Sequence, residues 1–458
     1  MHDTTRTITW PLIRTPRAQA VRQERRLLRA CAAFVVACIA QAAFCQSIRV
    51  TADRPDGVYA VGDTVHWTVQ PQDGMTDLTY MVFPNQGNAP SVTGKVSGEL
   101  IDYTFDKPGT VLLRVKGKKA DGKEANAVGG AVAAPEQIQP SAPRPTDFDD
   151  FWAAKIRELR AIPMGEELSP VDSGVSGVKY SKVTLNNING THIRGQIARP
   201  DKPGKFPGLL QVQYAGVYGL PKDFVTGRAR EGWLALNISA HDIPIDESPA
   251  FYKAQSDGPL KNYPAIGNDD RETSYFLRMY LSCVRAVDYL KTQPDWDGKT
   301  LIVIGGSMGG MQSLVTAGLC PDDVTAAIAD VPAGCDMLGP KVGRRGGYPS
   351  WWELTRGQDW KTPHDPDKVH EASRYFDVVN FAPKIQAHVL IGVGLLDDVC
   401  PAAGVYAAFN QIPSKNKQIV PLPSAGHMNE HDSHKPFNDL QWGVWMPKLL
   451  KGQLPSTE

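Results

Sequence analysis

The stretch Val303-Ile304-Gly305-Gly306-Ser307-Met308-Gly309-Gly310 decides the fold prediction, because a short apolar run ends there in a Gly-x-Ser-x-Gly turn. Residues 301–304 have the apolar character of a buried parallel strand, and residues 308–319 can continue as a helix. Gly305 and Gly309 remove side chains where the strand and the helix must pack closely. The stretch therefore predicts a nucleophile elbow that exposes the Ser307 hydroxyl above a sheet. A glycine-rich connecting turn is the alternative for this motif taken alone.

An acid and then a histidine follow in the chain order that an α/β-hydrolase requires. Asp397 and Asp398 come after an apolar run, and His427 lies in a loop after the predicted strand 418–422. A catalytic serine needs a histidine to accept its proton, and the histidine needs a carboxylate that fixes its tautomer. We therefore predict Ser307 as the nucleophile, His427 as the general base and then acid, and Asp397 as the orienting carboxylate. Asp398 is the competing candidate for the carboxylate.

Several further landmarks carry a family resemblance. They are Phe148-Asp149-Asp150-Phe151-Trp152, Val212-Gln213-Tyr214, the elbow itself, Val331-Pro332-Ala333-Gly334-Cys335-Asp336, Tyr375-Phe376-Asp377 with Asn380-Phe381-Ala382, and Gly394-Leu395-Leu396-Asp397 through Ala407-Ala408-Phe409-Asn410. From about residue 148 onward, the chain resembles the acetyl xylan esterase and cephalosporin C deacetylase group, carbohydrate esterase family seven, or a close sister branch. In that family the Asp directly after the Gly-Leu-x element is catalytic, which favours Asp397 over Asp398.

The resemblance also implies the donors of an oxyanion hole. In the family these are the backbone amides of the residue after the nucleophile and of a tyrosine in a Gln-Tyr element. Here those residues are Met308 and Tyr214. Tyr214 follows the predicted strand 208–212, where such a loop belongs. Each N–H aimed at the developing negative oxygen is worth about 3 kcal/mol in a dry pocket.

The chain departs from the family after the predicted strand 233–238. The family carries an Arg-Gly-Gln element there, whereas this chain has Ser239-Ala240-His241-Asp242. Because that element helps to organise the family's pocket, its substrate preference does not carry over. Two expectations stand side by side: His241 lines the pocket, or His241 and Asp242 form a local hydrogen-bonded pair.

The segment 343–352 interrupts the alternation of strands and helices, at a place where lids form. Its last two residues, Trp351 and Trp352, could stack on the faces of sugar rings, and packing within the lid is the alternative. The tryptophan pair and an N-terminal β-sandwich would also suit a rival function, a non-catalytic carbohydrate-binding protein. That rival leaves the Ser-His-Asp set unexplained.

A metal-dependent hydrolase is the second rival function, because His427, His431 and His434 lie within one short segment. A metal site would need further acids at defined distances, and it would leave the elbow unexplained. The sequence therefore predicts neither a metal nor a cofactor.

The first 45 residues have the features of a signal peptide. They hold seven Arg against two acids, then the apolar run 30–40, then small residues before Gln46. The apolar run is well short of the roughly 20 residues that span a membrane. Arg25-Arg26-Leu27-Leu28 hints at twin-Arg export, but the ordinary secretory route fits better, with cleavage after Ala42 or Cys45. We predict a periplasmic or secreted protein without an integral membrane span.

Three segments are expected after the signal peptide. Residues 46–136 contain runs of period two, such as 64–69 and 110–115, which indicate an immunoglobulin-like β-sandwich. Residues 137–147 form a Pro-rich linker, and residues 148–458 alternate strands and helices, which predicts an α/β-hydrolase catalytic domain. The linker suggests few obligatory contacts, so a chain starting near Pro140 should keep activity on small esters.

Charge and cysteine content limit the partners. Subtracting the +5 of residues 1–45 from the formal charge of 0 leaves about −5, and no basic patch with aromatic residues remains, which argues against nucleic acid. Four cysteines, Cys283, Cys320, Cys335 and Cys400, suit buried thiols, although a disulfide is allowed. The expected partner is an acylated carbohydrate or another small ester. The family forms ring-like hexamers, an assembly that the N-terminal sandwich could block.

Overall fold

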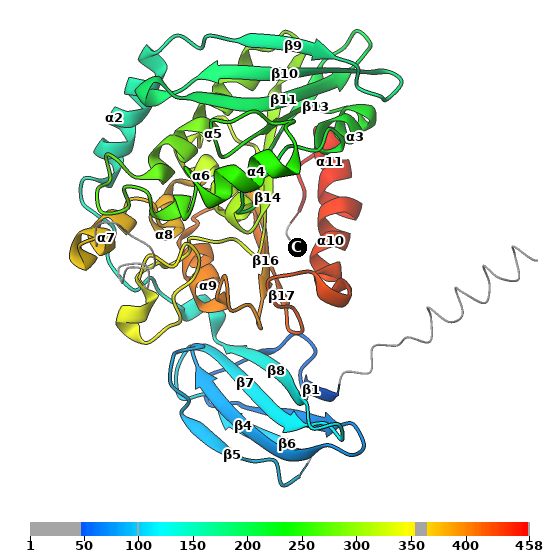
Figure 1. Ribbon diagram of the computed structural model, residues 1–458, viewed down its shortest axis with the longest axis vertical. Coiled ribbons are helices and arrows are strands. Elements are labelled where there is room, and N and C mark those ends of the chain that lie inside the picture. The colour runs from blue at the N-terminus through cyan, green and yellow to red at the C-terminus, as the bar shows by residue number, and fades with distance from the viewer. Residues whose placement is uncertain (1–46, 99, 353–363, 457–458) are drawn as a thin grey trace, which may run out of the picture.

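The computed structural model describes residues 47–98, 100–352 and 364–456. Figure 1 shows two lobes, an all-β lobe at the N-terminal end of the described chain and a larger lobe of helices around a central sheet. We call them the β-lobe (residues 47–133) and the hydrolase lobe (residues 148–456). The predicted signal peptide lies outside the described residues. Within the described ranges, no helix has both the length and the apolar character of a membrane span.

The hydrolase lobe is built on a nine-stranded sheet with the order β17-β16-β15-β14-β12-β13-β11-β10-β9. The strands are β9 (Glu167–Val171), β10 (Val178–Asn186), β11 (His192–Pro200), β12 (Phe206–Gln211), β13 (Leu234–Ile238), β14 (Trp296–Gly306), β15 (Ala326–Asp330), β16 (His388–Gly394) and β17 (Lys417–Leu422). Neighbours from β17 to β13 pair in parallel, whereas β11, β10 and β9 add antiparallel pairs at one edge. This mostly parallel sheet between helices confirms the predicted α/β-hydrolase fold.

Helices cover both faces of this sheet because its inner strands are apolar on both sides. The α-helices of the described ranges are α2 (Phe148–Ala161), α3 (Asp223–Glu231), α4 (Pro249–Asp257), α5 (Tyr275–Thr292), α6 (Met308–Leu319), α7 (Pro366–Ser373), α8 (Val378–Phe381), α9 (Ala402–Gln411), α10 (Lys435–Leu440) and α11 (Met446–Leu450). In β14, Leu301 and Val303 join the core of α2, α5, α6 and α9. Ile302 and Ile304 point the other way, into the core of α3, α10 and α11.

The β-lobe consists of two sheets around a core of its own. One sheet has the order β1-β3-β6 and the other β2-β8-β7-β4-β5. The strands are β1 (Ile48–Ala52), β2 (Val58–Tyr59), β3 (Thr64–Pro71), β4 (Thr76–Pro84), β5 (Val92–Lys95), β6 (Leu100–Thr104), β7 (Gly109–Lys118) and β8 (Glu124–Ala133). Along β3, Val65, Trp67 and Val69 alternate into the core, as period two requires. The all-β region is therefore confirmed, and its immunoglobulin-like character stays a prediction.

The Pro-rich segment 137–147 is attached to the hydrolase lobe along its length. The backbone N–H and the hydroxyl of Ser141 both donate to the Asp336 carboxylate, at 2.7 and 2.6 Å. Further along, Arg144 donates to the Asn380 carbonyl at 2.8 Å. The expected linker is therefore held against the hydrolase lobe, by partners that lie far ahead in the chain and that only the fold brings near.

The β-lobe also touches the hydrolase lobe directly, just beyond the carboxyl end of β16 (Figure 1). The buried Gln86 side chain donates to the Leu395 carbonyl at 3.1 Å. A Cβ placed on Gly130 would lie 2.5 Å from the same carbonyl oxygen, so only glycine fits there. Leu395 stands two residues before Asp397, and the β-lobe therefore supports the loop that carries the predicted acid.

The cysteines Cys283, Cys320, Cys335 and Cys400 are free thiols in this structure. Burial raises the pKa of all four thiols, so they are neutral near pH 7. Of the two alternatives that the sequence allowed, the structure shows free thiols, with Cys283, Cys320 and Cys400 buried and Cys335 half-buried.

Candidate active site

Ser307 stands in a sharp turn between β14 and α6. Its backbone has φ 56° and ψ −121°, a conformation that residues with a side chain rarely adopt. A Cβ placed on Gly305 would lie 2.6 Å from the Gly309 carbonyl carbon, and one placed on Gly309 would lie 2.9 Å from the Val212 carbonyl oxygen. Glycine at both positions lets the strand, the turn and the helix close around the serine.

Three side chains from separate loops meet above this turn. Ser307 Oγ lies 2.8 Å from His427 Nε2, and His427 Nδ1 lies 2.8 Å from Asp397 Oδ2. They come from the carboxyl ends of β14, β16 and β17, which are brought together at one edge because the three strands run parallel. This geometry allows a proton to pass from the serine to an imidazole whose far nitrogen faces a carboxylate.

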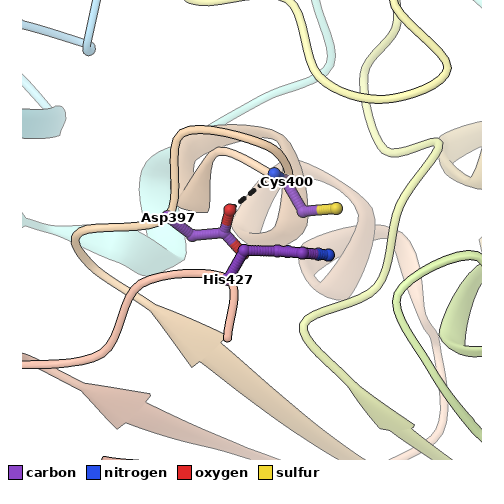
Figure 2. A group of neighbouring side chains, drawn as sticks. All are labelled: Asp397, Cys400 and His427. Atoms are coloured by element: carbon purple, nitrogen blue, oxygen red, sulfur yellow. Dashed lines mark hydrogen bonds and ion pairs between the residues drawn. The ribbon is translucent and has the colours of Figure 1, made fainter. Parts of the chain in front are cut away.

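The structure separates the two candidate acids by their surroundings. Asp397 is 0% exposed, and its second oxygen accepts the backbone N–H groups of Val399 and Cys400, at 2.8 and 2.7 Å. Figure 2 shows this carboxylate between the Cys400 amide and the His427 ring. The Asp398 side chain is 58% exposed and faces Arg345 at 3.7 Å. Only Asp397 is held in the position of an orienting carboxylate.

The two expected oxyanion donors border the elbow. Met308 is the first residue of α6, so its N–H is one of the helix N-terminal donors that has no partner within the helix. Tyr214 lies in the loop after β12, whose backbone packs closely against Gly309. The Tyr214 ring is 53% exposed and stacks on Tyr218, while the Tyr218 hydroxyl donates to the Tyr214 carbonyl at 3.0 Å. These contacts order the loop whose first residues pack against Gly309 in the elbow.

Residues 135–446 match the model of the family described as acetyl xylan esterase. The chain belongs to the acetyl xylan esterase family. It is therefore a serine-type carboxylic ester hydrolase that acts on acetylated substrates, as the resemblance implied. The matched residues run from the segment that docks on the hydrolase lobe to the start of α11, and they include the loops of the candidate active site.

Individual relatives agree with the family. The acetyl esterase Axe7A of Xylanibacter ruminicola is 35% identical over 384 residues, which cover 82% of this chain and 83% of the relative. The solved acetyl xylan esterase 1 from Thermoanaerobacterium sp. is 24% identical with a TM-score of 0.57, covering 69% of this chain and 97% of its own. The acetyl xylan esterase from Paenibacillus sp. R4 has the same identity of 24% and TM-score of 0.57, with coverages of 70% and 98%. At this identity the two solved structures show the shared fold.

In this acetyl xylan esterase family member, His241 supports a loop and does not line a pocket. The side chain is 1% exposed, with Nε2 2.9 Å from the Gly216 carbonyl oxygen and Nδ1 2.7 Å from the Tyr275 hydroxyl. Burial lowers the pKa of His241 to about 4, so the neutral ring donates from Nε2 to Gly216. His241 also does not pair with Asp242, whose carboxylate binds Arg194 at 3.0 Å instead. Its burial thus corrects the first expectation for His241, and its bonds to Gly216 and Tyr275 correct the second.

The two tryptophans of the esterase do not form an exposed pair. Trp351 is 2% exposed, its indole N–H donates to the Pro264 carbonyl at 2.8 Å, and its ring packs on Phe276. Stacking of Trp351 on a sugar is therefore wrong, because the ring belongs to the core. Trp352 is half-buried and stacks on His370 at 4.1 Å between ring centroids.

Two buried tyrosines beside the esterase's elbow were missed by the sequence analysis. The Tyr263 hydroxyl lies 3.2 Å from Met308 Sδ and 3.2 Å from the Tyr348 hydroxyl, and it accepts the Gly216 N–H at 3.3 Å. Burial raises the pKa of both phenols, which keeps them neutral. Tyr263 lies in a connecting segment without a motif, and the segment 343–352, in which a lid was expected, gave no signal for the position of Tyr348.

The three histidines of the metal-hydrolase rival do not converge on one point. His434 bonds to Asp330 Oδ2 at 2.8 Å and to the Gly426 carbonyl oxygen at 3.2 Å, whereas His431 is exposed. Among the described residues, the group with metal-ligand spacing is Asp397, Cys400 and His427, whose ligand atoms lie within 4.8 Å (Figure 2). The hydrogen bonds between serine, histidine and carboxylate already account for this group.

Proposed function

We propose that the protein is a secreted serine esterase that removes short acyl groups, above all acetyl, from carbohydrates such as xylan or xylo-oligosaccharides. The observation that carries the proposal is the pair of hydrogen bonds that link Ser307 Oγ to His427 and His427 to Asp397, each 2.8 Å long. Family membership and the name of the relative Axe7A, an acetyl esterase, support acetyl as the acyl group. The xylan esterases of the same fold support a carbohydrate as the alcohol.

Acylation begins when Ser307 Oγ attacks the ester carbonyl carbon while His427 Nε2 takes the hydroxyl proton. Asp397 holds the ring with Nδ1–H toward it, so that Nε2 is free to accept, and it stabilises the imidazolium that forms. His427 then gives the proton to the leaving sugar oxygen, and the acyl group stays on the serine. A water molecule releases it in a second attack, activated by the same histidine. The mechanism uses neither a metal nor a cofactor.

The N–H groups of Met308 and Tyr214 are the proposed oxyanion donors in both steps. They would stabilise the negative oxygen of each tetrahedral intermediate, with about 3 kcal/mol from each well-placed donor. The position of Met308 at the start of α6 adds the positive end of the helix dipole at that point.

Replacement of the nucleophile tests the proposal. We expect Ser307→Ala to abolish turnover of 4-nitrophenyl acetate and labelling by a serine-directed organophosphate, with an unchanged thermal melt. Chelator treatment of the wild-type enzyme should leave its activity intact. Full turnover by the variant would transfer the chemistry to another group.

An ester panel tests the substrate. The panel holds 4-nitrophenyl acetate, 4-nitrophenyl butyrate, feruloyl esters and acetylated xylan, each assayed with Ser307→Ala as the blank. We expect acetate over butyrate and release of acetate from xylan. A preference for feruloyl esters would instead assign the protein to phenolic substrates.

Secretion rests on residues 1–45, with their seven arginines and short apolar run. We propose that these residues are removed during export and that the mature enzyme starts between residues 43 and 46. N-terminal sequencing of the enzyme recovered from the periplasm or medium checks both points. Intact residues 1–45 on a cytoplasmic enzyme would contradict them.

A further inference from the structure

A second histidine–aspartate pair lies directly behind the loop of His427. His434, the residue before α10, is buried, and its Nδ1 lies 2.8 Å from Asp330 Oδ2 at the end of β15. Its Nε2 lies 3.2 Å from the carbonyl oxygen of Gly426. The backbone N–H of His434 donates to Asn429 Oδ1 at 2.8 Å, which fixes the residue at the helix start.

Both ring nitrogens of His434 therefore face acceptors. A neutral imidazole carries one N–H and can satisfy only one of them, whereas an imidazolium donates to both. The surroundings of the ring favour the imidazolium. Burial opposes ionisation, but Asp330 and, at longer range, Asp397 both act to raise the pKa of His434, which lies above its usual value. Its neighbour Lys435 pairs with Asp439 along α10.

The pair connects the two halves of the catalytic centre. The backbone carbonyl of Asp330 accepts the Ser307 N–H at 2.9 Å, so Asp330 is fixed to the elbow on one side. Gly426 immediately precedes His427 on the other side. The second carboxylate oxygen of Asp330 is buried and has no hydrogen-bond partner among the described residues, where His434 is the hydrogen-bond donor to this side chain.

We propose that His434, in its doubly protonated form, is a positioning residue that holds the Gly426 carbonyl against Asp330 and thereby keeps His427 within reach of Ser307. The proposal rests on the proposed function, because it concerns the same catalytic histidine. His434 does not touch the reacting atoms and acts only through the loop that carries His427.

An alkaline limb in the pH profile of kcat follows from the charge on His434. His434 must be charged to hold both acceptors. Because its pKa is raised, the hold is complete at low pH and is lost as the pH rises through that pKa, which produces a fall toward alkaline pH.

His434→Gln tests the proposal, because glutamine keeps one donor of similar size and cannot titrate. We expect kcat for 4-nitrophenyl acetate to fall about tenfold to a hundredfold near neutral pH, with KM unchanged and the alkaline limb abolished. The matched control is His66→Gln, since His66 also pairs with an aspartate, Asp102 at 2.8 Å, but lies exposed in the β-lobe. The control should keep the wild-type profile.

Asp330→Asn gives an independent reading. Loss of the counter-charge should move the alkaline limb to lower pH without removing it, which a merely structural defect would not do. The ring ¹⁵N shifts of His434 in the wild-type enzyme should report two protonated nitrogens at pH values below the alkaline limb, whether or not the variants fold. A neutral His434 ring, or a wild-type alkaline limb in His434→Gln, overturns the proposal. Failure of the proposed function is distinguished by Ser307→Ala, which would then remain active.

Discussion

Ser307 is held in a conformation that its own backbone disfavours. A non-glycine residue in such a sparsely populated region costs about 1 to 3 kcal/mol, and surrounding contacts must compensate. The Ser307 N–H donates to the Asp330 carbonyl. Val331, the residue after Asp330, also has a positive φ, of 38°. Two residues with disfavoured backbone conformations thus lie at the ends of two neighbouring strands. The site geometry is maintained there at a cost in local stability.

At the residue scale, the two adjacent acids give a sharp prediction. We expect Asp397→Asn to lower kcat by about 10³ to 10⁴, because the amide no longer selects the His427 tautomer that can accept from Ser307. Asp398→Asn, its exposed neighbour, is the matched control and should stay near wild-type. Steady-state kinetics on 4-nitrophenyl acetate rank the two, and the reverse order would assign the role to Asp398.

The sequence was most informative for residues whose role follows from a strand end. Ser307, Asp397 and His427 each follow a predicted strand, in the order typical of the fold. This was enough to predict that they lie close together, because the carboxyl ends of parallel strands meet at one edge. The same reasoning did not predict the burial of Trp351 and His241. Their burial depends on aromatic residues of α5 and of the segments flanking it, which no local pattern announces.

At the element scale, the loop after β12 packs closely against the start of α6. Gly309→Ala would place a Cβ 2.9 Å from the Val212 carbonyl oxygen and push that loop from the elbow. We expect kcat to fall by about 10² or more while KM changes little, because the oxyanion donors on both elements lose their alignment.

The matched control for this helix glycine is Gly227→Ala in α3, where an added Cβ would meet nothing within 4 Å. It should raise stability slightly, by about 0.4 to 1 kcal/mol, and leave kinetics unchanged. Equal activity of the two variants in a 4-nitrophenyl acetate assay would show that the Gly309 contact does not matter for catalysis.

Side-chain capping determines where a helix of this chain begins. Helix α5 begins at Tyr275, because the Ser274 side chain accepts the Phe276 N–H at 3.3 Å. The strand predicted at 418–422 is β17, Lys417–Leu422. Apolar periodicity thus located the elements, and side-chain capping decided where this helix begins.

At the scale of the whole molecule, the position of the β-lobe matters for catalysis. Its contacts with Leu395, two residues before Asp397, argue against the expectation that a chain starting near Pro140 keeps activity on small esters. That expectation relied on a Pro-rich composition, which does stiffen a chain but says nothing about what it lies against. Contacts such as Ser141 with Asp336 join residues almost 200 positions apart and carry no local signal.

A single glycine tests the coupling between the lobes. We expect Gly130→Ala, which would place a Cβ 2.5 Å from the Leu395 carbonyl oxygen, to lower both the melting temperature and kcat for 4-nitrophenyl acetate. Gly98→Ala, in the same lobe with nothing within 4 Å, should change neither. A Gly130→Ala enzyme that melts early yet keeps the wild-type kcat would mean that the contact serves stability alone.

The four free thiols have a consequence for handling the enzyme. In the folded chain all four are neutral, three are buried and Cys335 is half-buried, so they exchange poorly with disulfides and withstand air. An unfolded chain exposes all four together at ordinary thiol pKa values, and oxidation then links chains that can no longer refold. Heat inactivation should therefore be irreversible in air and recover in part when a reductant is present during cooling, so that shelf life depends on keeping the chain folded rather than on excluding oxygen.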